Sequence, residues 1–126
     1  MSYMIAKSIT IMPDKIVYVG CDNNIWPHYD GHFEKELNWE NLRYLVNDLV
    51  GWCIQPSQPW WQSMGKMLRA MYTWEQVVRD DDVAQDAMDL LVTRYNAKVI
   101  DNYKRMKKEG QDVHLTLIPM QRKVNA

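Results

Sequence analysis

Four side chains between residues 28 and 34 alternate in a pattern that could assemble a metal site. They are His28, Asp30, His32 and Glu34. On an extended strand all four project from one face, and imidazole and carboxylate groups placed this way can converge on zinc or manganese. A closed ligand set also needs a residue from elsewhere, and no other segment offers a strong partner. We therefore interpret the segment as the charged face of an edge strand. A metal-assisted hydrolase built on it is the alternative.

Large aromatic side chains are the second feature, because the chain has six Trp and seven Tyr but a single Phe. Trp61 directly follows Trp60, and adjacent residues on a helix point about 100° apart, so one faces the core and the other its margin. Trp26, in a polar stretch, and Trp52 are further candidate anchors of the kind that dominates interfaces. We predict that Trp26, Trp60 and Trp61 bind a protein partner or a second copy of the chain. The alternative is a wide buried stripe on this helix.

Charge is unevenly distributed although the total is only -1. Residues 1–93 carry a net charge of -6. Residues 94–126 carry eight basic and three acidic side chains, which gives a net charge of +5. The basic side chains that could contact phosphates are Lys104, Arg105, Lys107 and Lys108. Basic residues at the end of a helix also complement its dipole, and a nucleic-acid-binding domain is normally basic overall. Weak nucleic-acid binding is therefore an alternative function that we do not favour.

The common catalytic and nucleotide-binding motifs do not occur in the sequence. There is no glycine-rich phosphate loop and no nucleophile elbow, so we predict no catalytic residue and no cofactor. Cys21 and Cys53 are not spaced as a redox or metal pair, which favours a reducing, cytoplasmic location. Cys53 falls on the apolar stripe of a predicted helix and is interpreted as a buried structural thiol. No stretch is apolar enough to cross a membrane.

The residue pattern in the first third of the chain predicts β-strands. Residues 3–11 and residues 15–19 are apolar runs rich in β-branched side chains. Pro13 and Asp14 between them favour a type I turn, because proline presets φ and aspartate bonds to nearby backbone. The alternation over residues 28–37 then predicts a third strand at the edge of the sheet, or a structured loop in the same place.

Three helices and a final strand are predicted next. Apolar residues recur at three- and four-residue spacing over residues 38–54, 59–79 and 80–110. Asn38 suits the N-cap position of the first helix, and Gly110 suits the position just after the end of the third helix. The polar-apolar alternation of 111–118 predicts a strand that joins the N-terminal hairpin, and we expect residues 119–126 to form a flexible tail.

These elements define one α+β domain over residues 1–126. The order is β-β-(β)-α-α-α-β, with three helices packed on one face of a small, mostly antiparallel sheet. A chain of 126 residues with 47% hydrophobic side chains can form one core without disulfides or a structural metal. We expect a non-catalytic binding or inhibitor protein that acts on a macromolecular partner through its aromatic surface. Proteins of this kind include anti-defence accessory proteins of phages and mobile elements.

Overall fold

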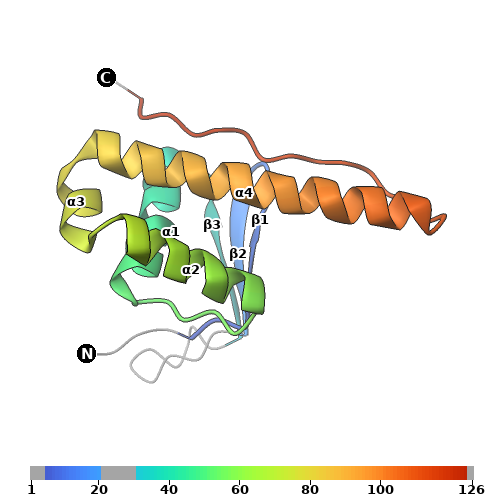
Figure 1. Ribbon diagram of the computed structural model, residues 1–126, viewed down its shortest axis with the longest axis horizontal. Coiled ribbons are helices and arrows are strands. Elements are labelled where there is room, and N and C mark those ends of the chain that lie inside the picture. The colour runs from blue at the N-terminus through green and yellow to red at the C-terminus, as the bar shows by residue number, and fades with distance from the viewer. Residues whose placement is uncertain (1–4, 21–30, 125–126) are drawn as a thin grey trace.

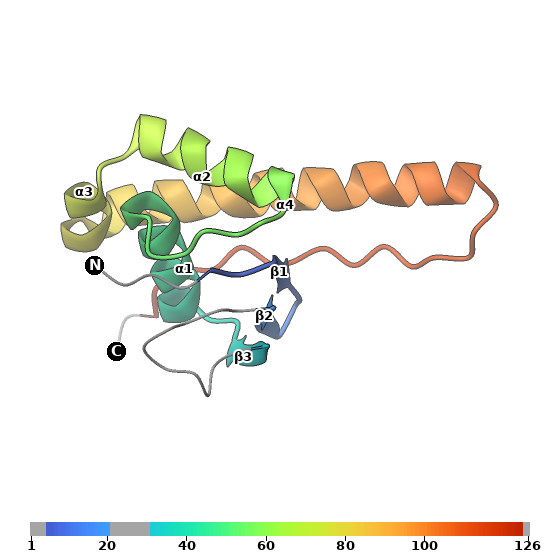
Figure 2. The same ribbon diagram turned by 90° about the horizontal axis from the view of Figure 1, so that it is seen from below.

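A computed structural model describes residues 5–20 and 31–124 (Figure 1). Its sheet has three antiparallel strands in the order β1-β2-β3, and Figure 2 shows the strands on one side of the helices. The strands are β1 (Ser8–Ile11), β2 (Lys15–Val19) and β3 (His32–Glu36). The helices are α1 (Trp39–Gly51), α2 (Pro59–Met71), α3 (Trp74–Arg79) and α4 (Asp81–Lys108). The predicted α+β class is confirmed.

The N-terminal hairpin forms as predicted, with β1 and β2 joined across Pro13 and Asp14. Ile9 lies opposite Tyr18, and Ile11 lies opposite Ile16, and all four side chains are buried. Alternate residues of a strand point to opposite faces, so this hairpin presents one apolar face to the helices. That face forms one side of a single hydrophobic core.

The third strand is also confirmed, and it lies at the edge of the sheet. In β3, Phe33 stacks on Tyr18 of β2 with the ring centroids 4.5 Å apart. The other side chains of β3 are exposed. An edge strand with charged side chains discourages pairing with other molecules, which agrees with our first interpretation of this segment.

The first predicted helix is shorter than expected at its end. Asn38 caps α1 as predicted, because its side-chain oxygen accepts a hydrogen bond from the Asn41 N–H at 2.8 Å. The helix ends at Gly51, where Trp52 adopts the left-handed conformation with φ 63°. The prediction that the helix continues to Ile54 was wrong.

The second predicted helix is in fact two helices. Pro59 begins α2 as predicted, and α2 ends at Met71. Thr73 then caps α3 in a reciprocal pair with Gln76, in which each side chain accepts a hydrogen bond from the backbone N–H of the other residue. This capping box starts a new helix, so the single helix predicted up to Arg79 was wrong.

The predicted C-terminal strand was also wrong, because residues 111–118 contribute no strand to the sheet. The outer edge of β1, which it would join, is already occupied by side chains. Trp61 Nε1 donates a hydrogen bond to the Ile9 carbonyl at 2.7 Å, and the Ile11 N–H donates to the Tyr95 hydroxyl at 3.2 Å. These two aromatic side chains therefore occupy hydrogen-bonding positions on β1 that a neighbouring strand would use.

The C-terminal segment instead turns back and follows α4, as Figure 1 shows. The Asn96 side chain accepts from the Ile118 N–H and donates to the Ile118 carbonyl, both at 3.0 Å. Farther along, Arg122 pairs with Asp89 at 2.7 Å. Residues 119–124 thus contact the body of the protein, and the flexibility of the tail stays a prediction.

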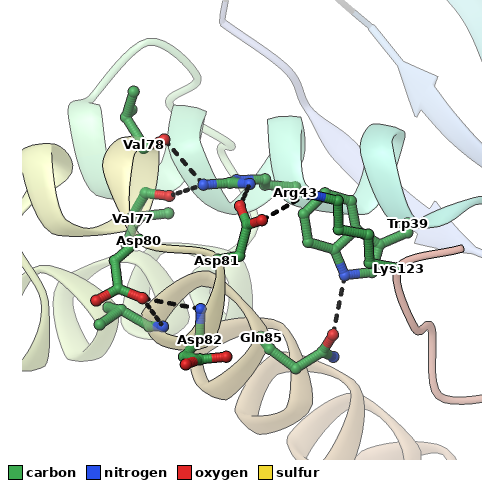
Figure 3. A network of polar contacts seen from close by, with 10 residues as sticks. Trp39, Arg43, Val77, Val78, Asp80, Asp81, Asp82, Gln85 and Lys123 are labelled. Atoms are coloured by element: carbon green, nitrogen blue, oxygen red, sulfur yellow. Dashed lines mark hydrogen bonds and ion pairs between the residues drawn. The ribbon is translucent and has the colours of Figure 1, made fainter. Parts of the chain in front are cut away.

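A network of polar contacts joins α1, α3, α4 and the C-terminal segment (Figure 3). Arg43 donates to the carbonyls of Val77 and Val78, at 2.7 and 2.9 Å, and forms an ion pair with Asp81. Lys123 binds the other carboxylate oxygen of Asp81 at 2.6 Å. These hydrogen bonds and ion pairs lower the pKa of Asp81. The network holds the end of α3 and the start of α4 against α1.

Candidate binding surface

The structure separates the two adjacent tryptophans of α2. Trp61 is 1% exposed, and its indole N–H donates a hydrogen bond to the Ile9 carbonyl at the outer edge of β1. It has almost no exposed surface except where it lines the cavity described below, and its role as an anchor for a partner stays a prediction. Trp60 is half-buried and packs edge-on against Trp61, with the Lys98 amino group 4.8 Å from its ring centroid. Its role in binding stays a prediction, and Trp26 lies outside the described residues.

The proposed metal ligands are only partly within the described residues. His32 and Glu34 lie on β3, where the His32 Nε2 and Glu34 Oε1 atoms are 3.4 Å apart. The same Glu34 oxygen lies 3.3 Å from the Lys15 amino group. Across residues 5–20 and 31–124, no group of three His, Cys, Asp or Glu side chains could hold a metal. His28 and Asp30 lie outside these ranges, so the metal alternative stays untested.

The basic cluster of the C-terminal region lies at the far end of α4. Its members are all exposed: Lys104, Arg105, Lys107 and Lys108. The Lys107 amino group is 5.8 Å from the centre of the Tyr103 ring. This end of the helix extends well beyond the other elements (Figure 2), so the charges are accessible. Nucleic-acid binding by this cluster stays a prediction.

The second cysteine does not occupy the predicted position. Cys53 lies after the end of α1 and is half-buried, so the prediction of a thiol on the apolar stripe of the helix was wrong. Burial raises its pKa, and the nearby charge of Asp48 raises it further. A raised pKa leaves less of the reactive thiolate at neutral pH. The thiol is therefore poorly suited to act as a nucleophile.

A groove between α2 and the chain after α1 is a candidate binding site. Its cavity has a volume of about 350 Å³. Its buried lining comes from Leu49, Ile54, Pro56, Trp61 and Gly65, and its other lining residues include the cationic Lys66 and Arg69. No acidic side chain of the described chain lines this cavity. An apolar floor with a cationic margin suits a ligand that is apolar and negatively charged.

Trp52 lines this groove and is 53% exposed. Its left-handed backbone ends α1, with the Trp52 N–H bonded to the Asp48 carbonyl. Glycine is the usual residue in this conformation, because a side chain there is sterically unfavourable. The backbone of Trp52 is therefore strained, and its large side chain remains half exposed to solvent.

Arg69 holds the Trp52 ring from the α2 side. Its guanidinium carbon lies 4.2 Å from the ring centroid, and its Nη1 donates to the Leu49 carbonyl at 2.7 Å. A Cβ atom at position 65 would lie 3.0 Å from that same nitrogen, so Gly65 leaves the space that the guanidinium needs. Burial lowers the pKa of Arg69, but arginine stays charged at neutral pH.

Trp74 extends the exposed apolar surface beyond the groove. It is 50% exposed at the start of α3. A Cβ atom added to Gly51 would come within 2.7 Å of the Trp74 ring, so this ring rests on the backbone immediately before Trp52. We call Trp52, Arg69 and Trp74 together with the groove the Trp52 surface.

Sequence reasoning singled out Trp52 but missed Trp74 and Arg69. Trp74 looked like one more apolar position in a continuous helix, since the break at Thr73 was not recognised. Arg69 looked like an ordinary surface cation. Gly51 before Trp52 is a signal that could have shown the early end of α1, because glycine is common near helix C-termini.

No family model matches the chain, and neither a curated protein nor a solved structure matches it. In the described part of the chain, no helix is both long and apolar enough to span a bilayer. Function is therefore inferred from the chemistry of the surface itself.

Proposed function

We propose that the protein is a non-catalytic binding protein whose Trp52 surface holds a short acidic and apolar segment of a protein partner. The observation that carries this proposal is the exposed Trp52 ring, stacked on Arg69 at the margin of an apolar groove. Tryptophan and arginine are the residue types most enriched among the side chains that dominate binding energy at interfaces.

The shape of the surface favours a protein segment over a small molecule. A cavity of about 350 Å³ lies at the lower end of the range for small-ligand pockets. The exposed rings of Trp52 and Trp74, the second of which rests on Gly51, continue the apolar contact outside the cavity. A segment that inserts one large apolar side chain into the groove would cover these residues as well.

The charges favour an acidic segment. Lys66 and Arg69 both line the groove, and Arg69 is partly desolvated by its contacts with Trp52 and the Leu49 carbonyl. A carboxylate of the partner can bind the free N–H groups of a guanidinium with good geometry. A protein that covers such a segment would inhibit its partner by occupancy and would need no chemistry of its own.

Selection of random peptides displayed on phage tests this proposal. We expect the enriched peptides to combine a Trp, Phe or Leu with Asp or Glu nearby. In fluorescence polarisation, Trp52→Ala should weaken binding of the best peptide roughly thirty-fold, which corresponds to about 2 kcal/mol. Arg69→Lys keeps the charge but loses the planar stacking group, so it should also weaken binding.

Tyr44→Ala is the matched control, because Tyr44 is 57% exposed on α1 but does not line the groove. Its affinity for the peptide should equal that of the unchanged protein. Thermal melting of all three variants establishes that each is folded. Binding that is equally strong in Trp52→Ala, or enrichment of basic peptides, would rule out the Trp52 surface as the site.

A further inference from the structure

The second half of α4 and the segment that returns along it form an arm that extends beyond the rest of the protein (Figure 2). The arm comprises residues 97–108 and 111–117. The fully buried residues of α4 end at Val92, and the half-buried Tyr95, which contacts Trp60 and Trp61, is the last side chain of the helix that packs on the described core. On the returning segment, Leu115 and Leu117 are 44% and 43% exposed.

The backbone of the returning segment has unused hydrogen-bonding groups. The segment is anchored at both ends, by the Gln111 N–H on the Met106 carbonyl and by Ile118 on Asn96. Between these anchors, residues 112–117 make no backbone hydrogen bond to any residue that the structure describes. Stretched backbone with open N–H and C=O groups is a template for pairing with another strand.

The anchor at Ile118 shows which backbone groups are open to a partner. Its N–H and its carbonyl both point towards Asn96 on α4. In an extended chain the N–H and C=O of one residue point to the same edge, and successive residues alternate between the two edges. The backbone groups of His114 and Thr116 therefore share the edge that Ile118 turns to Asn96. Those of residues 113, 115 and 117 point to the opposite edge.

We propose that this open edge pairs with the same edge of a second copy of the chain, antiparallel and about a twofold axis at Leu115. Leu115 then lies opposite Leu115 of the other copy, and Val113 lies opposite Leu117. Both copies use the same three residues, as a twofold interface requires. The pairing satisfies the open backbone groups and brings the exposed leucines together on one face.

Charge favours this antiparallel arrangement. The basic residues at the end of α4 lie next to the start of the returning segment, at the tip of the arm. Antiparallel pairing places the two tips at opposite ends of the dimer, whereas parallel pairing would place them side by side. Between residues 113 and 118 the only ionisable side chain is His114, and it faces Thr116 of the other copy. No like charges are directly opposed within the paired strands.

Two proline substitutions test the pairing, with sedimentation velocity of the full chain over a concentration series as the measurement. We expect the unchanged protein to dimerise reversibly. Leu115→Pro removes an N–H from the paired edge and should raise the dimer dissociation constant roughly tenfold or more. Thr116→Pro is the matched control, because its N–H lies on the other edge, and its dimerisation should match the unchanged protein.

Circular dichroism melting shows whether both proline variants keep the folded body, as expected for positions outside the core. A protein that stays monomeric at several hundred micromolar would overturn the proposal. Equal effects of the two prolines, or dimerisation unchanged in Leu115→Pro, would also overturn it. Trp52→Ala should dimerise normally, so failure of this inference is distinguishable from failure of the proposed peptide-binding function.

Discussion

Replacing Trp61 with alanine is expected to lower the free energy of unfolding by about 4 kcal/mol. The side chain is one of the largest that the core buries completely. Its removal leaves a cavity, and it also leaves the Ile9 carbonyl at the edge of β1 without its hydrogen-bond donor. Urea unfolding followed by circular dichroism measures the loss.

Trp60→Ala is the natural comparison, because the neighbouring side chain is only half-buried and makes no hydrogen bond that the structure shows. We expect it to destabilise the protein by about 1 to 2 kcal/mol, clearly less than Trp61→Ala. Trp61→Phe keeps most of the buried surface but removes the indole N–H, so it should fall between the two. If both alanine variants cost the same, Trp61 is not the residue that closes the sheet edge.

Asp48→Asn is expected to stabilise the protein at pH 8 by up to about 3 kcal/mol. Burial raises the pKa of Asp48 from 3.8 to about 6, although the charge of Lys35 opposes the shift. In the folded state this carboxyl therefore holds its proton up to a higher pH than in the unfolded state. Its contribution to stability is complete below about pH 4 and is lost as the pH rises through 6.

Unfolding at a series of pH values between 4 and 8 checks this sign. The gain from Asp48→Asn should be near zero at pH 4 and should reach its maximum above pH 7. Asp101→Asn is the control, because Asp101 is an exposed carboxylate on α4, and it should show no comparable pH-dependent gain. A gain that is constant with pH would mean that the ionisation of Asp48 is not its cause.

Much of the fold could be predicted because its signals are local. The turn at Pro13 and Asp14 and the cap at Asn38 depend on residues within a few positions, and both formed as predicted. Alternation of apolar residues correctly identified the buried face of the hairpin. Such signals do not depend on where the rest of the chain lies.

The absence of a C-terminal strand could not be predicted because strand pairing depends on distant residues. The pattern of residues 111–118 is that of a strand, but a strand needs a free edge, and Trp61 and Tyr95 close the edge of β1. The Trp52 surface was hidden for the same reason. It forms only when α2 brings Arg69 over the end of α1, which no pattern within either helix indicates.

If Trp52 binds a partner as proposed, its backbone conformation opposes stability to binding at a single residue. A left-handed conformation costs a residue with a side chain about 1 kcal/mol relative to glycine, and half of this side chain stays in water. A screen that selects only for thermal resistance would therefore favour Trp52→Gly. The stabilised protein would no longer carry the Trp52 ring that lines the groove, so under the proposed function its engineering must select for ligand capture together with heat tolerance.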